Sequence, residues 1–174
     1  TSGTAVTYEV ANPSNNVEWT SIAYDSNADK YIVAWRGGDG DNYLYGCTLT
    51  VTGSAGSESI SKGTTVQITT QNNRHDLAFD STINQIACRY MNDNMYLKLR
   101  YLAISGTNIT VGNEVSINSN NDAHGSNDDG WTQSIVHCDT AQRMFLIHSR
   151  GQDSNRIGFS TVSGGTATNN LSSY

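Results

Sequence analysis

The sequence has little proline, little charge and no long apolar run. Only one of its 174 residues is proline, and charged residues make up 15% of the chain. The longest apolar runs are about five residues, whereas a membrane-spanning helix needs roughly 20, so the sequence predicts no such helix. Basic residues are few and unclustered and the formal net charge is −6, which argues against binding to nucleic-acid phosphates.

Cysteine is also scarce, and its spacing is not that of a metal site. The three cysteines, Cys47, Cys88 and Cys138, form no CxxC pair and no Cys/His pattern at metal-ligand spacing. We expect them to be small buried residues, with one disulfide left open as an alternative. Between the short apolar segments the sequence holds Gly, Ser, Thr and Asn, a composition typical of a β protein with many turns.

A unit of short strands recurs three times along the chain, and an aspartate marks each copy. The first strand of each copy runs into Asp25, Asp80 or Asp139, and a second apolar strand begins six residues later. The aspartates are 55 and 59 residues apart, somewhat more than the roughly 40–50 residues of a propeller blade. The spacing therefore indicates blades with enlarged loops.

The rest of each copy follows the same order. After a turn rich in Gly, Asn and Asp comes a third strand, which ends at a glycine-containing turn, and a fourth strand follows in the first two copies. The predicted strands are 21–25, 31–35, 43–51 and 65–68; then 76–80, 86–90, 96–104 and 114–117; then 135–139, 145–149 and 156–162.

These copies predict a single repeat domain over 1–174. Residues 1–16 form the outer strand of a preceding or closing blade, because 9–16 parallels 114–121. The blades are 17–73, 74–121 and 122–174, the last with an incomplete outer strand. The expected fold class is all-β, β-propeller-like, with three four-stranded antiparallel blades that are half or part of a larger ring. A β-sandwich is the alternative, but it does not explain why the pattern recurs.

Three blades are fewer than the four to eight of closed propellers. We expect self-association, with a head-to-tail pair of chains closing a six-bladed ring. Neighbouring blades of a longer chain are the alternative partners.

Two segments resemble known repeats. Residues 21–35 and 104–115 look like the propeller-type repeats of long secreted and virion-surface proteins, including tail and fibre proteins of aquatic bacteriophages. The resemblance implies an extended extracellular or virion-surface protein and carries over no functional residue. The third copy departs most, with His137 and His148 where small residues are expected.

The turns between second and third strands hold the candidate ligand-binding residues. They recur at equivalent places, and their carboxylates and amides could coordinate Ca²⁺ or hydrogen-bond sugar hydroxyls, although Asn and Asp also suit such turns for backbone reasons. Trp35 and Tyr90 end the second strands, where their rings could stack on a sugar or pack between blades. The turn residues are Asp39, Asp41, Asn42, Asp93, Asn94, Asp153 and Asn155.

No catalytic pattern is recognisable in the sequence. We therefore predict a non-enzymatic structural or adhesive module of an extracellular or virion-surface appendage, with no cofactor unless Ca²⁺ binds. The alternative is a carbohydrate-binding, lectin-like propeller with shallow glycan sites at the repeated turns. N-glycosylation motifs at Asn108 and Asn170 would support an exterior surface if they are used.

Overall fold

The structure is a computed structural model that describes residues 17–37, 43–71, 74–92, 96–117, 134–149, 157–163 and 166–168. Every regular element in these ranges is a β-strand, and all strand pairs are antiparallel. The prediction of an all-β chain with antiparallel sheets is therefore confirmed. These ranges contain no helix long and apolar enough to cross a membrane.

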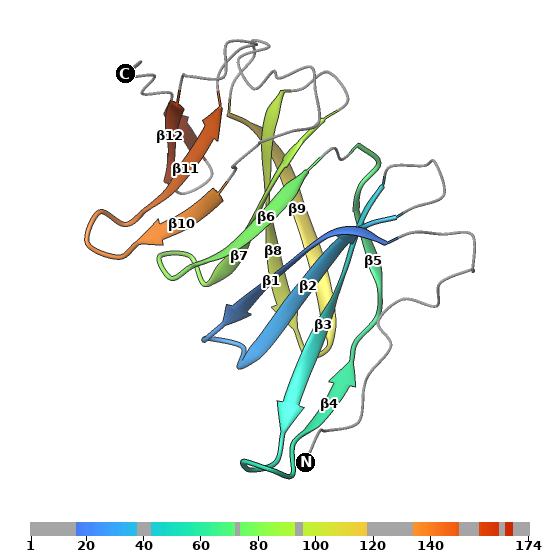
Figure 1. The fold of residues 1–174 in the computed structure, drawn as a ribbon. Helices are drawn as coiled ribbons and strands as arrows, with labels where there is room; N and C mark the ends of the chain where they lie inside the picture. The colour runs from blue at the N-terminus through green and yellow to red at the C-terminus, as the bar shows by residue number, and fades with distance from the viewer. Residues whose placement is uncertain are drawn as a thin grey trace.

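The strands form three separate sheets, here called A, B and C, in chain order (Figure 1). Sheet A contains β1 (Glu18–Asp25), β2 (Lys30–Arg36), β3 (Leu44–Thr52), β4 (Ser59–Lys62) and β5 (Val66–Thr69). Sheet B contains β6 (His75–Asp80), β7 (Gln85–Met91), β8 (Leu97–Ser105) and β9 (Asn108–Ser116). Sheet C contains β10 (Ser134–Cys138), β11 (Arg143–Ser149), β12 (Ile157–Ser163) and β13 (Thr166–Thr168).

The outer strands differ most from the sequence prediction. In sheet A the fourth strand is split, since β4 and β5 both pair with β3 on either side of Gly63. In sheet B the fourth strand begins at Asn108, not at Glu114, because the turn after Ser105 leads directly into pairing with β8. Sheet C has a short fourth strand, β13, which pairs with β12.

The third unit is offset by one residue from the predicted register. Asp25 and Asp80 end their strands and pair with the first residue of the next strand. In sheet C the equivalent residue is Cys138, which pairs with Arg143. Asp139 is therefore the first residue of the turn, and its alignment with the other two aspartates is wrong.

The offset also changes the positions assigned to two histidines. In each sheet, the last residue of the turn between the first and second strands has a positive φ: Asp29, Asn84 and Gln142. This shared feature supports the same alignment. The equivalent sets are Tyr24, Phe79 and His137, and Trp35, Tyr90 and His148. The expectation of small residues at the two histidine positions is wrong, because sheets A and B carry aromatic rings there.

The sheets stack face to face around two apolar clusters. One lies between sheets A and B and includes Ile32, Ala34, Leu77, Ile86 and Leu102. The other lies between sheets B and C and includes Ala87, Leu99, Ile135, Met144 and Leu146. The first strands bring the sheets closest together, with β1 beside β6 and β6 beside β10. Sheet B is thus covered on both faces.

Two titratable side chains of sheet B lie in these interfaces. His75 faces sheet A, where it hydrogen-bonds with the backbone of Ala34, and burial lowers its pKa to about 4. Arg89 faces sheet C and has no exposed surface. Burial lowers the pKa of Arg89 to about 10, and the carboxylate of Asp76, its cross-strand neighbour, opposes that shift.

A close backbone contact joins the outer parts of sheets A and B. The Thr48 hydroxyl in β3 donates to the carbonyl of Thr107, in the turn between β8 and β9, over 2.8 Å. Gly63 lies at this contact, where a Cβ would stand 2.1 Å from Thr107 O and 2.2 Å from Thr48 Oγ1. A larger residue at position 63 fits only if the Gly63 or Thr107 backbone shifts.

We expect Gly63→Ala to destabilise the fold by about 3 kcal/mol or more, because its methyl group overlaps both partners of the contact. Gly106→Ala is the matched control, since nothing lies within 4 Å of a Cβ there. Its positive φ should cost only about 1 kcal/mol. Urea unfolding measures both variants, and equal losses would contradict the close approach of the sheets.

Candidate functional site

Polar side chains of sheets B and C meet at the turn that follows β6. Asp80 is buried there; its Oδ1 accepts a hydrogen bond from the Thr82 N–H over 3.0 Å and its Oδ2 from the Tyr101 hydroxyl over 3.1 Å. His137 of β10 lies against this turn, with Nε2 3.2 Å from Asp80 Oδ1 and 3.0 Å from Thr82 Oγ1. Burial and the Asp80 carboxylate raise the pKa of Tyr101, so its hydroxyl stays a donor.

A second carboxylate completes the cluster on the other side of the imidazole. Asp139 Oδ1 lies 2.9 Å from His137 Nδ1 and accepts a hydrogen bond from the Ser81 hydroxyl over 2.6 Å. Ser81 Oγ is also 3.3 Å from His137 Nδ1. The hydrogen bonds from Ser81 and His137 hold the pKa of the Asp139 carboxyl below its ordinary value.

The contacts from Asp80 through His137 to Ser81 have the order of a catalytic serine triad, but their polarity differs. A serine nucleophile needs a base that takes its proton. Ser81 instead donates to Asp139, and both imidazole nitrogens face carboxylate oxygens, which only accept. Nδ1 is therefore placed to donate to Asp139, and Nε2 lies beside both Asp80 Oδ1 and the Thr82 hydroxyl. This cluster ties the turn of sheet B to the first strand of sheet C.

A shallow groove of about 410 Å³ lies beside this cluster. Its lining residues are Ser26, Ala78, Phe79, Ser81, Val136, His137 and Asp139. The three sheets contribute equivalent turn residues, and apolar side chains from β6 and β10 lie between them. The groove is at the end of the sheets opposite the turns that were predicted to bind ligands, because successive antiparallel turns lie at opposite ends.

Most of the predicted ligand residues lie outside the described ranges. They are Asp39, Asp41, Asn42, Asp93, Asn94, Asp153 and Asn155. The turns next to them are closed by backbone hydrogen bonds, from Gly37 N–H to Tyr43 O and from Asn92 N–H to Tyr96 O. The Tyr96 N–H also donates to Asn92 Oδ1 over 2.9 Å. Glycan or Ca²⁺ binding at these turns stays a prediction.

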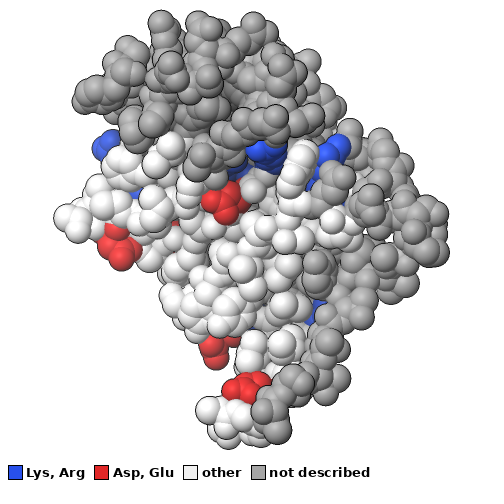
Figure 2. Space-filling model, viewed as in Figure 1, with Lys and Arg blue, Asp and Glu red and all other residues white. Residues whose placement is uncertain are grey.

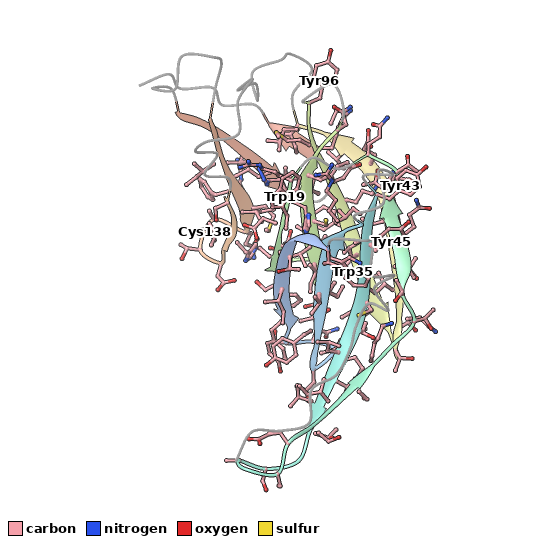
Figure 3. All side chains as sticks on the ribbon, turned by 45° about the vertical axis from the view of Figure 1, so that its right-hand side comes forward. Trp19, Trp35, Tyr43, Tyr45, Tyr96 and Cys138 are labelled. Atoms are coloured by element: carbon pink, nitrogen blue, oxygen red, sulfur yellow. The ribbon has the colours of Figure 1, made fainter. Side chains whose placement is uncertain are left out.

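The two aromatic residues predicted beside those turns are packed in the protein. Neither Trp35 nor Tyr90 has exposed surface, and they belong to different clusters. Trp35 stacks on Tyr45 with ring centroids 6.4 Å apart (Figure 3), and the Tyr90 hydroxyl donates to Glu114. Two roles were expected for these rings, stacking on a sugar or packing within the protein. In the structure both rings are packed within the protein.

The remaining predicted positions are the three cysteines and the two glycosylation motifs. Cys47 and Cys88 are buried and Cys138 is partly buried, all as free thiols, and burial raises the pKa of Cys88 to about 12. Asn108 is exposed at the start of β9, and Asn170 lies outside the described ranges. No group of three or more His, Cys, Asp or Glu in the described part is placed to hold a metal ion.

Trp19 is a further candidate functional residue, and the sequence alone did not identify it. Its φ of 44° is unusual for a bulky residue, and it lies at the irregularity in the pairing of β1 with β2. The guanidinium carbons of Arg36 and Arg74 are 4.6 Å and 5.3 Å from its ring centroid. These contacts hold an exposed aromatic ring at the boundary between sheets A and B.

Comparisons of the chain with protein-family models, with curated proteins and with solved structures found no match.

We expect the three aspartates to differ in their effect on stability. Asp80→Ala should cost about 3 kcal/mol, because it removes a buried acceptor of several hydrogen bonds. Asp25→Ala should cost about 1 kcal/mol, because its Oδ1 accepts from the N–H groups of Asn27 and Ala28. Asp139→Ala should cost least of the three, since that side chain is 85% exposed.

Chemical unfolding of the three variants measures this order. A loss for Asp139→Ala as large as that for Asp80→Ala would contradict the one-residue offset of sheet C.

Proposed function

We propose that the chain is a non-enzymatic structural and adhesive module of an extracellular or virion-surface appendage, built as three blades of a β-propeller. One observation carries the proposal: three antiparallel sheets stack in chain order with equivalent faces in contact. The adjacency of β1, β6 and β10 supports it further, because the inner strands of blades line a common axis.

The middle sheet supports stacked blades over a two-sheet sandwich. In β7 all residues from Ile86 to Met91 are buried. Continuous burial is typical of a strand that is covered on both faces, whereas a strand in a two-layer sandwich alternates between buried and exposed side chains. Sheet B is covered in this way by sheet A on one face and by sheet C on the other.

The surface and the polar cluster support a role without catalysis. Figure 2 shows only scattered charged side chains on the described part of one face, which suits contact with neutral partners. Ser81 and His137 are engaged with carboxylates in a link between sheets. The extracellular or virion location rests on the resemblance of residues 21–35 and 104–115 to repeats of such proteins.

The non-enzymatic proposal is tested most sharply at Ser81. We expect the protein not to react with a fluorophosphonate probe, which labels activated serines, because the Ser81 hydroxyl donates to Asp139 and has no free base to activate it. Mass spectrometry of the treated protein measures the labelling, and Ser81→Ala is the matched control. Labelling of the wild-type protein that disappears in Ser81→Ala would overturn the proposal.

A further inference from the structure

Exposed apolar side chains gather on the two outward faces of the sheet stack. Among the described residues, seven large apolar side chains are exposed. Four lie on the face of sheet A that is turned away from sheet B: Ile22, Tyr24, Val51 and Ile60. Two lie on the face of sheet C that is turned away from sheet B: Val136 and Ile147. Trp19 is the seventh.

The exposed positions of sheet A are buried positions in sheet B. The strand registers align Ile22 with Leu77 and Ile60 with Ile109. Ile22 and Ile60 are 59% and 40% exposed, whereas Leu77 and Ile109 are 6% and 7% exposed. The difference arises because sheet B packs this face on sheet A. Val33, Trp35 and Cys47 on the same outward face are already buried. The exposed part of this face therefore has the composition of a face that packs on a preceding sheet.

The outward face of sheet C is the complementary half of the same interface. Val136, which is 55% exposed, is equivalent to Ala23 and Ala78. Ala23 packs into the cluster between sheets A and B, and Ala78 into the cluster between sheets B and C. Ile147 is likewise equivalent to Ala34, which has no exposed surface.

We propose that the outward face of sheet C packs on the outward face of sheet A in a second copy of this chain. This inference rests on the proposed stack of blades and gives the expected head-to-tail pair a defined surface. The occupant is a second copy because the two outward faces are the two halves of an interface that the chain itself forms twice. Two copies around a two-fold axis bury the exposed apolar side chains of all four faces and close a ring of six sheets.

The turns indicate how the two faces align. His137 of sheet C lies against the turn of sheet B, and Phe79 of sheet B shares a groove with Ser26 in the turn of sheet A. Tyr24 is the equivalent residue of sheet A and is 42% exposed. In the proposed pair it packs against the turn of the second copy that begins at Asp139.

Light scattering coupled to size-exclusion chromatography tests the proposal. We expect the wild-type protein to have twice the 18.8 kDa of one chain. Ile22→Glu and Val136→Lys should each give the mass of one chain, because each buries a charge in an apolar interface. Asn108→Glu, at an exposed position on the tip of sheet B, is the control and should keep the double mass.

Mixing the two single-chain variants distinguishes a head-to-tail pair from other dimers. A mixture of Ile22→Glu and Val136→Lys should recover the double mass, because one interface is then wild-type and the other joins opposite charges. A dimer that survives either variant alone would overturn the proposal. A wild-type protein with the mass of one chain would also overturn it, while Ser81 labelling, which does not depend on mass, would still decide the proposed function.

Discussion

Apolar contact between successive sheets is the interaction on which the rest of this structure depends. A single antiparallel sheet of short strands has two apolar faces to bury. Both faces of sheet B are buried, with Leu77 and Ile86 packed toward sheet A and Ala87 and Leu99 packed toward sheet C. The free energy of this contact comes from apolar area removed from water, which is not directional. The order of the sheets therefore needs a second kind of contact that fixes their relative positions.

Hydrogen bonds at the edges of the apolar clusters fix the relative positions of the sheets. Thr48 reaches Thr107 between sheets A and B, and the Ile135 N–H donates to Asp76 between sheets B and C. The cluster of Asp80, His137, Ser81 and Asp139 belongs to the same class of contact, although its residue types are those of a hydrolase site. Its geometry favours a structural role, because the serine and the imidazole both donate to carboxylates.

The sequence was most informative where a local rule determines the structure. Alternating apolar segments and turn residues predicted the sheets and most strand positions, since strand and turn preferences act over a few residues. The offset of sheet C was missed because Asp139 in the turn can be aligned with Asp25 and Asp80. The polar cluster was missed because His137 and Ser81 meet only through stacking of sheets far apart in sequence. The exposed position of Trp19 results from an irregular strand pairing, and no sequence motif predicts that irregularity.

Face-to-face packing is the central claim, and His75 reports on it directly, since its ring lies in the interface of sheets A and B and hydrogen-bonds with the backbone of Ala34. An NMR titration of the histidine ring protons, with His75→Gln to assign the signal, measures its pKa in the folded protein. The packing described here predicts a pKa of about 4, lowered by burial. A pKa near the ordinary 6.5 would mean that water reaches the ring, and would contradict the packing of sheet A on sheet B.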